Sequence, residues 1–185
     1  TRGYWFPSPT NFTIVGLKVP DDVNQTEQNI EIIRFTAGPP PPYSSTTNSF
    51  VSLGRYIRYP SGGIIPVNIP AVTGDILGIY GGSSNPGSTT IYHSYGVPGP
   101  YTSNIGGYTT VLTRSGMQYN LINEPMHDVW EEVNYEVARV EMYYTLPGSP
   151  FVVHKAVLGG AEPQAEPVRS GYGYEAGAST APISM

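Results

Sequence analysis

Short runs in which apolar and polar residues alternate occupy most of this chain, and turn-forming residues separate them. A period of two is typical of half-buried β-strands, whereas an amphipathic helix repeats its apolar positions every three or four residues. The runs predict nine strands, at residues 12–19, 30–36, 50–59, 64–69, 75–80, 89–95, 108–113, 117–122 and 137–145. Nine short strands at this spacing predict an all-β fold, an antiparallel β-sandwich or jelly roll.

Two segments depart from this pattern. Between residues 123 and 140 the apolar positions fall at helical spacing, which predicts a helical turn or loop at residues 125–132 before the last strand begins. Residues 38–43 read Gly-Pro-Pro-Pro-Pro-Tyr. This stretch is interpreted as a stiff extended connection that crosses from one sheet to the other, with a ligand for a proline-reading partner as the alternative.

The composition narrows the class of protein further. The 185 residues include 22 glycines, 19 prolines and 15 tyrosines, and only 12% are charged, which argues against a helical bundle or coiled coil. Hydrophobic residues make up 39%, enough to bury a core and to argue against disorder. A net charge of −5 offers no basic surface for phosphates, so nucleic acid is not an expected partner. No apolar stretch is long enough for a membrane span.

The location of the protein is inferred from residue usage. Cysteine is absent, which excludes disulfides, thiolate metal sites and cysteine nucleophiles. Few lysines, many serine, threonine, glycine and tyrosine residues, and a start that resembles a processed end together favour export. We therefore expect an extracellular or cell-surface protein.

Few residues occur in patterns that indicate catalysis or metal binding. The three histidines lie far apart, with no zinc-ligand spacing, and no nucleophile elbow, phosphate-binding loop or dinucleotide fingerprint occurs. Acidic residues gather between residues 124 and 141, and weak calcium candidates among them are Asp128, Glu131 and Glu132. Because adjacent carboxylates usually form a solvated face, we expect no metal, no cofactor and no enzymatic activity.

Tyrosine is the one polar-aromatic excess. Four tyrosines fall in a stretch rich in glycine, proline and serine: Tyr92, Tyr95, Tyr101 and Tyr108. They could stack on sugar rings, form a protein–protein interface, or simply occupy strands, and the residue types leave these alternatives open. Asn11 and Asn24 fit the N-glycosylation pattern, which chance alone would produce about twice in such a chain.

The chain divides into a body, residues 1–146, and an extended arm, residues 147–185, that is rich in glycine, alanine and proline. One segment of the arm, residues 151–158, is apolar on both faces of a strand and therefore needs burial on both. We expect it to add to a sheet of the next subunit, with docking on its own body as the competing account. The predicted subunit contacts are Phe151, Val152, Val153, Val157 and Leu158.

Several stretches together resemble a known group of proteins. They are residues 1–6 (TRGYWF) with 11–20 (NFTIVGLKVP), residues 73–79 (TGDILGI) and residues 139–144 (RVEMYY). The set resembles secreted bacterial β-sandwich domains of cell-surface proteins, several of which carry a C-terminal sorting tail of the PEP type. The resemblance covers about residues 1–146 and implies export and a non-catalytic surface role. The chain departs from the group after residue 147, where no hydrophobic anchor with a basic stop follows.

Two functions follow as expectations. The first is a structural subunit of an extracellular filament or surface layer, because low charge density and abundant tyrosine suit contacts between identical neighbours. Its partner would be a second copy of itself, joined by the exchanged arm. The alternative is a secreted carbohydrate-binding, adhesive module whose partner is a polysaccharide and whose tyrosines form the platform.

Overall fold

The structure is a computed structural model that describes residues 1–22, 24–98, 101–148, 152–156 and 166–169. These residues form strands, bends and turns, and no helix occurs among them. Consequently none of the described residues belongs to a helix that could span a membrane. The strands are β1 (Arg2–Pro7), β2 (Phe12–Lys18), β3 (Glu27–Phe35), β4 (Phe50–Pro60), β5 (Ile65–Ala71), β6 (Ile76–Ser84), β7 (Tyr95–Pro98), β8 (Tyr101–Ile105), β9 (Tyr108–Gly116), β10 (Trp130–Glu131), β11 (Glu136–Ala138), β12 (Glu141–Thr145), β13 (Val152–Ala156) and β14 (Glu166–Arg169).

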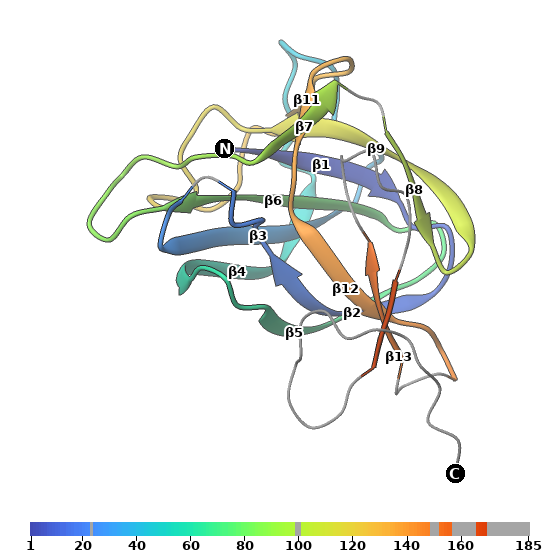
Figure 1. Ribbon diagram of the computed structural model, residues 1–185. Coiled ribbons are helices and arrows are strands. Elements are labelled where there is room, and N and C mark those ends of the chain that lie inside the picture. The colour runs from blue at the N-terminus through green and yellow to red at the C-terminus, as the bar shows by residue number, and fades with distance from the viewer. Residues whose placement is uncertain (23, 99–100, 149–151, 157–165, 170–185) are drawn as a thin grey trace.

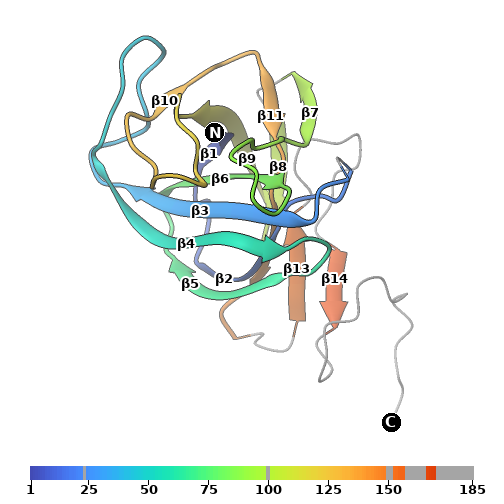
Figure 2. The same cartoon turned by 90° about the vertical axis from the view of Figure 1, so that its left-hand side faces the viewer.

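Two antiparallel sheets make up most of the molecule (Figures 1 and 2). The first is seven-stranded in the order β10-β9-β1-β6-β3-β4, with β8 also paired to β9. The second is five-stranded in the order β14-β13-β12-β2-β5, and a short pair joins β11 to β7. Some neighbours are consecutive strands, such as β3 and β4, whereas β1 pairs with β6 and β9 from distant parts of the chain. The expected all-β, sandwich-like class of fold is confirmed; its jelly-roll wiring stays a prediction.

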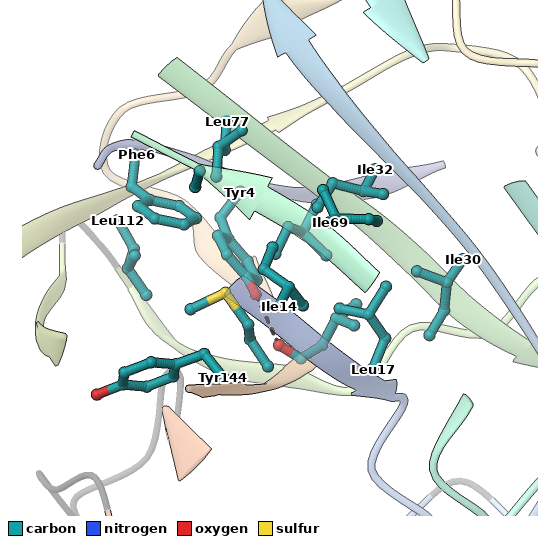
Figure 3. Packing of buried hydrophobic residues seen from close by; sticks show 14 of the residues in the cluster. Tyr4, Phe6, Ile14, Leu17, Ile30, Ile32, Ile69, Leu77, Leu112 and Tyr144 are labelled. Atoms are coloured by element: carbon teal, nitrogen blue, oxygen red, sulfur yellow. Dashed lines mark hydrogen bonds between the residues drawn. The ribbon is translucent and has the colours of Figure 1, made fainter. Parts of the chain in front are cut away.

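A main hydrophobic core fills the space between the two sheets (Figure 3). Alternation places every second side chain of each strand in this core, as in β1, where Tyr4 and Phe6 point inward and Trp5 points to the other face. The second sheet contributes Ile14, Leu17 and Tyr144 from the opposite side. The Tyr4 hydroxyl donates to the Val140 carbonyl oxygen at 2.7 Å, so the largest polar group of the core is satisfied.

A second apolar cluster covers the outer face of the seven-stranded sheet. Strand residues Ile33, Phe35 and Tyr80 meet side chains from the irregular segment that leads into β10: Met117, Leu121, Met126, Val129 and Trp130. Strand β3 is therefore buried on both faces, and its buried positions form a nearly continuous run that includes the polar residues Gln28, Asn29 and Glu31. This second cluster therefore keeps the outer face of the sheet away from water, and the irregular segment forms the surface on this side of the molecule.

The strands predicted from alternation are mostly confirmed, but two of them are wrong. Residues 89–95 form no strand until Tyr95, although Tyr92 makes a single bridge to Ser83. Residues 117–122 form bends and a turn and no strand. Of the helical turn or loop predicted at residues 125–132, the loop is what forms, and it leads into β10 at Trp130. In these segments the spacing of apolar residues reflects which side chains pack into the second cluster, and it does not reflect a regular backbone conformation. The predicted strand at 137–145 is divided between β11 and β12.

The proline-rich stretch also lies elsewhere than expected. Strands β3 and β4 are neighbours in the same sheet, so residues 36–49 form the loop of one long hairpin. The interpretation as a connection from one sheet to the other is wrong. The strands stay paired up to Phe35 and Phe50, and beyond them the loop lies against β10 and the segment that leads into it, to which Thr47 and Tyr43 form backbone hydrogen bonds.

The C-terminal arm is described only in part. Strand β13 pairs antiparallel with β12 of the same chain, with Tyr143 opposite Lys155 and Tyr144 opposite His154. Of the predicted subunit contacts, Val153 is buried, whereas Phe151, Val157 and Leu158 lie outside the described residues. The backbone of Val152 is part of β13. Exchange of this arm between copies stays a prediction.

Candidate functional site

An open cavity of about 360 Å³ lies on the outer side of the seven-stranded sheet. Small-molecule sites commonly have volumes of about 300–1,000 Å³, so this one falls at the lower end of that range. Two loops and the start of β10 supply its lining. The lining residues are Tyr43, Thr46, Gln118, Tyr119, Asp128 and Trp130.

Backbone hydrogen bonds hold the two loops together. The Thr47 and Val129 amides donate to each other's carbonyl oxygens at 2.8 and 3.0 Å. Further along, the Tyr43 amide donates to the Glu131 carbonyl oxygen at 3.2 Å, and the Glu131 amide donates to that of Pro41 at 2.8 Å. Prolines 39–42 have no amide hydrogen to satisfy and fix their own φ angles. The wall that carries Tyr43 is therefore stiff before any ligand arrives.

Aromatic rings dominate the cavity. Tyr43 is 70% exposed, and its ring centroid lies 5.3 Å from that of Trp130. Tyr119 is 48% exposed, and its ring lies 4.4 Å from the imidazole of His127 at an interplanar angle of 32°. Trp130 is buried, with the Arg2 guanidinium 5.0 Å from its ring centroid. Exposed aromatic rings that gather in one place with polar residues at the rim are a common feature of ligand-binding grooves.

A single carboxylate completes the cavity. Asp128 has a φ of 45°, and its backbone amide donates to the Asn48 side-chain oxygen at 2.8 Å while the Asn48 amide group donates back to Oδ1 at 2.8 Å. His127 Nδ1 lies 3.1 Å from Oδ2. Hydrogen bonds from Asn48 and then His127 lower the pKa of Asp128, so its carboxylate is ionised at neutral pH.

A buried ion pair anchors the segment that carries Tyr119 and Asp128. Glu31, 1% exposed on β3, accepts a hydrogen bond from the Met126 amide at 3.1 Å and lies 3.6 Å from Arg55 Nε. Arg55 in turn donates to the Leu121 carbonyl oxygen at 2.7 Å. Side chains of the sheet thus hold this irregular segment at two backbone groups, the Met126 amide and the Leu121 carbonyl.

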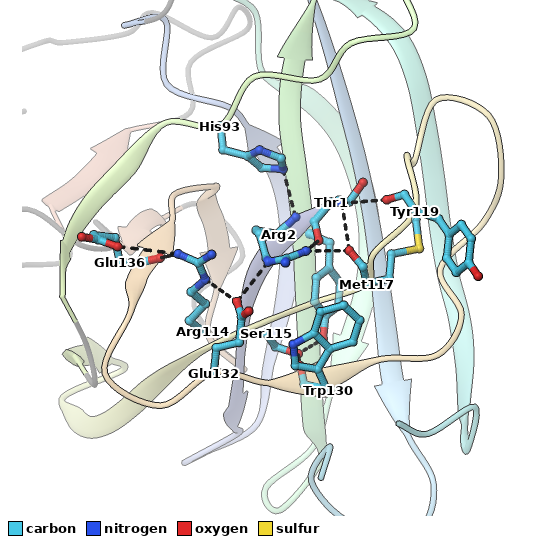
Figure 4. Close-up of polar contacts among 11 residues, drawn as sticks. Thr1, Arg2, His93, Arg114, Ser115, Met117, Tyr119, Trp130, Glu132 and Glu136 are labelled. Atoms are coloured by element: carbon cyan, nitrogen blue, oxygen red, sulfur yellow. Dashed lines mark hydrogen bonds and ion pairs between the residues drawn. The ribbon is translucent and has the colours of Figure 1, made fainter. Parts of the chain in front are cut away.

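A charged cluster lies beside the cavity, behind Trp130 (Figure 4). Glu132 Oε2 accepts hydrogen bonds from Arg2 Nε at 3.0 Å and from Arg114 Nε at 2.6 Å. Burial alone would raise the pKa of Glu132, but the charges of Arg2 and Arg114 outweigh it and the pKa is lowered. Arg2 Nη1 also donates to the Met117 carbonyl oxygen at 2.7 Å, which ties the cluster to the cavity segment.

Two exposed tyrosines flank the second arginine of this cluster. The Arg114 guanidinium lies 5.2 Å from the ring centroid of Tyr95 and 5.4 Å from that of Tyr135. Cation–π contacts at this distance favour a fixed arginine side chain. The arrangement explains the position of Tyr95, one of the predicted binding aromatics, through a contact inside the protein.

His93 is the titratable group of this cluster with the largest consequence for pH. Its Nε2 accepts a hydrogen bond from the Arg2 amide at 2.9 Å, which requires a neutral ring. Burial, followed by the positive charges of the Thr1 amino group, Arg2 and Arg114, lowers the pKa of His93 to about 3. An unfolded chain binds the proton near pH 6.5, so protonation favours unfolding in the window between those values.

The free energy of unfolding is therefore expected to fall as the pH drops below about 6.5, with a loss of up to about 2 kcal/mol at pH 5 from His93 alone. In His93→Gln, whose side-chain oxygen can accept from the Arg2 amide without titrating, this part of the pH dependence should disappear. Urea unfolding of both proteins between neutral pH and pH 5 measures the difference. Parallel pH profiles for the two proteins would contradict the assignment.

The four predicted binding tyrosines do not form one platform. Tyr95 contacts Arg114, whereas Tyr108 lies six residues earlier on β9, about 20 Å along the strand. Tyr101 is partly buried against the main core, and Tyr92 is exposed where its backbone pairs with Ser83. The four tyrosines therefore do not share one surface.

The calcium candidates also separate. Asp128 contacts Asn48 and His127, and the Glu131 carboxylate accepts a hydrogen bond from Trp5 Nε1 at 3.0 Å. Glu132 belongs to the arginine cluster. Among the described residues, no group of three or more acidic or histidine side chains is placed to hold a metal ion.

The predicted glycosylation sites, Asn11 and Asn24, are both exposed. The side-chain oxygen of Asn11 accepts a hydrogen bond from the Thr73 amide at 2.8 Å. Asn24 has a φ of 52°, a conformation typical of turns. Their modification stays a prediction.

Most of the cavity was not anticipated from the sequence. The sequence indicates Asp128 as a weak calcium candidate and Tyr43 as the end of a proline-rich connection. The available signal was the apolar spacing after residue 116, which marks a segment that packs on something. Nothing in the sequence places that segment beside residues 43–48, because the pairing is tertiary.

Comparisons of the chain with protein-family models, curated proteins and solved structures find no match. The chemistry of the cavity is therefore the guide to its ligand. Two exposed aromatic rings can cover the apolar faces of a ligand, while Asp128, Gln118 and Thr46 offer polar atoms at its edge. This combination suits a molecule with alternating apolar faces and polar rims.

Proposed function

We propose that this protein is an extracellular carbohydrate-binding module that uses the cavity between the two loops. The observation that carries the proposal is the pair of exposed rings, Tyr43 and Tyr119, from different loops beside Asp128. A pyranose ring presents C–H groups on its faces and hydroxyl groups around its edge. Tyrosine rings stack on the first, and carboxylate or amide oxygens accept hydrogen bonds from the second.

The construction of the site supports binding without large rearrangement. The proline-rich wall is stiff, and the opposite segment is held by the Glu31–Arg55 pair and by backbone bonds to residues 41–47. Rigid sites lose little conformational entropy when a ligand binds. The sandwich-like fold, for which we propose jelly-roll wiring, is one that lectin domains share. A cell-surface location fits the residue usage and the resemblance to secreted domains.

Replacing Tyr43 or Tyr119 with alanine is expected to weaken binding to a glycan selected on an array by up to about tenfold each, because each ring supplies about 0.5–1.5 kcal/mol beyond its buried area. Tyr108→Ala is the matched control. Tyr108 is 57% exposed, a fraction between those of Tyr119 and Tyr43. It lies at the other end of β9 from Gly116, eight residues or about 25 Å along the strand. Gly116 is the residue that pairs with Trp130 of the cavity. Titration calorimetry measures all three variants.

Two results would count against the proposal. One is a protein that retains no glycan above background on a broad array. The other is an equal loss of affinity in Tyr43→Ala and Tyr108→Ala, since the cavity would then contribute nothing specific.

A structural subunit of a filament or surface layer is the second candidate, in which an arm exchanged between copies repeats the contacts that β13 forms with its own β12. Lys155 Nζ lies 2.7 Å from the Glu141 carboxylate, and His154 stacks on Tyr144 with centroids 5.2 Å apart. Gly148, with a φ of 77°, lies in the turn that precedes β13. An exchanged arm would form the same contacts with β12 of the next copy. Filaments in negative-stain electron microscopy that disappear when residues 147–185 are deleted would support this candidate, and a concentration-independent monomer would exclude it.

A further inference from the structure

We infer that the ligand of the cavity is a glycan with free amino groups, a polymer of amino sugars in their ammonium form, recognised by Asp128. This inference rests on the proposed carbohydrate-binding function and specifies its substrate class. Of the six lining residues, Asp128 is the one that carries a charge, and no lysine or arginine is among them.

The Asp128 carboxylate is positioned for a cation. Asn48 and His127 each occupy one oxygen, and an ionised carboxylate has about four acceptor positions, so acceptor capacity remains. The side chain is 44% exposed, and the aromatic residues of the same cavity stand around the opening. The Asn48 pair fixes the carboxylate in place, so little side-chain entropy is lost when a ligand binds.

The rings on either side favour the same kind of ligand. An ammonium group within about 6 Å of a tyrosine or tryptophan face is attracted to its negative electron density. Tyr43 and Tyr119 can therefore stabilise the amino group or the sugar ring that bears it. A neutral sugar would use the rings but not the charge, and an acidic sugar would be repelled by Asp128.

Neighbouring charges leave this preference intact. Arg2 lies over Trp130 but is engaged by Glu132. Glu124 Oε2 lies 3.3 Å from His127 Nε2, so a second carboxylate faces the imidazole from the side away from Asp128. The surroundings of the cavity on this segment are therefore acidic. The net charge of −5 acts in the same direction on a polycation.

The test compares a glucosamine tetramer with its fully N-acetylated counterpart, which has the same ring framework without the charge. By titration calorimetry on the full chain, the glucosamine tetramer is expected to bind about tenfold more tightly, because its ammonium group attracts the Asp128 carboxylate as an ion pair and the neutral acetamide does not. Added salt should weaken binding of the glucosamine tetramer and leave the acetylated one almost unchanged.

Asp128→Asn separates charge from shape. Asparagine tolerates the positive φ of this position and can still accept from Asn48, so the fold should be kept. We expect this variant to lose the roughly tenfold preference, so that the two tetramers bind it with similar affinity. Gln118→Lys, an exposed change on the lining that keeps Asp128, should weaken glucosamine binding by charge repulsion and provides an independent check.

Each outcome decides between the two proposals. Equal or tighter binding of the acetylated tetramer, with loss of affinity in Tyr43→Ala, overturns the amino-sugar inference and leaves carbohydrate binding in place. Unchanged glucosamine affinity in folded Asp128→Asn or in Gln118→Lys also overturns the inference. Failure of both tetramers to bind, together with an empty glycan array, overturns the proposed function as well.

Discussion

Replacing Gly3 with alanine is expected to lower the free energy of unfolding by about 3 kcal/mol or more, at the upper end of what overpacking a core produces. Gly3 sits in the central strand β1, paired with Tyr80 of β6 on one side and Ser115 of β9 on the other. A Cβ atom at this position would penetrate the Ile79 carbonyl oxygen and lie 2.6 Å from the Tyr80 Cα. Both obstacles are backbone atoms of a buried strand, so they cannot move aside as a flexible side chain would.

Gly63→Ala is the matched control for that experiment. No atom lies within 4 Å of a Cβ built on Gly63, and its φ is not in the left-handed region. The control should be neutral or slightly stabilising, because alanine reduces the freedom of the unfolded chain. Urea unfolding followed by tryptophan fluorescence measures both variants. A loss below about 1 kcal/mol in Gly3→Ala would mean that β1 and β6 can separate, and the close approach would not limit the fold.

Gly3 also illustrates which part of the fold the sequence could not supply. Strand β1 was not among the predicted strands because its six residues include a glycine and a proline, which usually mark turns. In the structure it is a central strand, and the glycine is there because β6 approaches so closely. A residue that signals a break locally can be required by tertiary packing.

Most strands were predicted because alternation directly reflects which face of a sheet is buried. The strand predicted at residues 117–122 is wrong for the same reason. The apolar residues of the segment after residue 116, Met117, Leu121, Met126 and Val129, are all buried, but they are buried by an irregular chain lying on the sheet. Spacing reports burial and not backbone geometry, so it left a helical turn and a loop both open at residues 125–132, where the loop is what forms.

The candidate site was even less accessible from the sequence. Asn48 and Asp128 are 80 positions apart in the chain, and their loops are brought together by tertiary contacts such as the backbone hydrogen bonds between Thr47 and Val129. The same residue, Asp128, was identified as a metal candidate from its acidic neighbours. Its surroundings show instead a carboxylate that is paired with an amide and surrounded by rings, a change of chemistry that depends on the tertiary contact alone.

The loop that carries the site depends in turn on one buried carboxylate. Replacing Glu31 with alanine is expected to destabilise the protein by about 3 kcal/mol, near the low end of the range for a broken buried ion pair, since Arg55 retains some access to water. The change removes the acceptor of the Met126 amide at 3.1 Å and of the Ser52 hydroxyl at 2.7 Å, and it leaves Arg55 without its counter-charge. Two donors and a cation then lose their partner at once.

The effect on the site should exceed the effect on the rest of the fold. Met126 and Leu121 would lose their ties to β3 and β4, so the Met126 amide should exchange its hydrogen faster under native conditions, and glycan affinity should fall together with it. Glu31→Gln keeps the shape and one acceptor oxygen, and its loss should be intermediate. The control is Glu124→Ala, an exposed carboxylate on the same segment that contacts His127, expected to change the unfolding free energy by less than about 0.5 kcal/mol. If Glu31→Ala and Glu124→Ala unfold at the same urea concentration, the segment is held by its apolar side chains alone, and the ion pair is not what fixes Tyr119 and Asp128 in place.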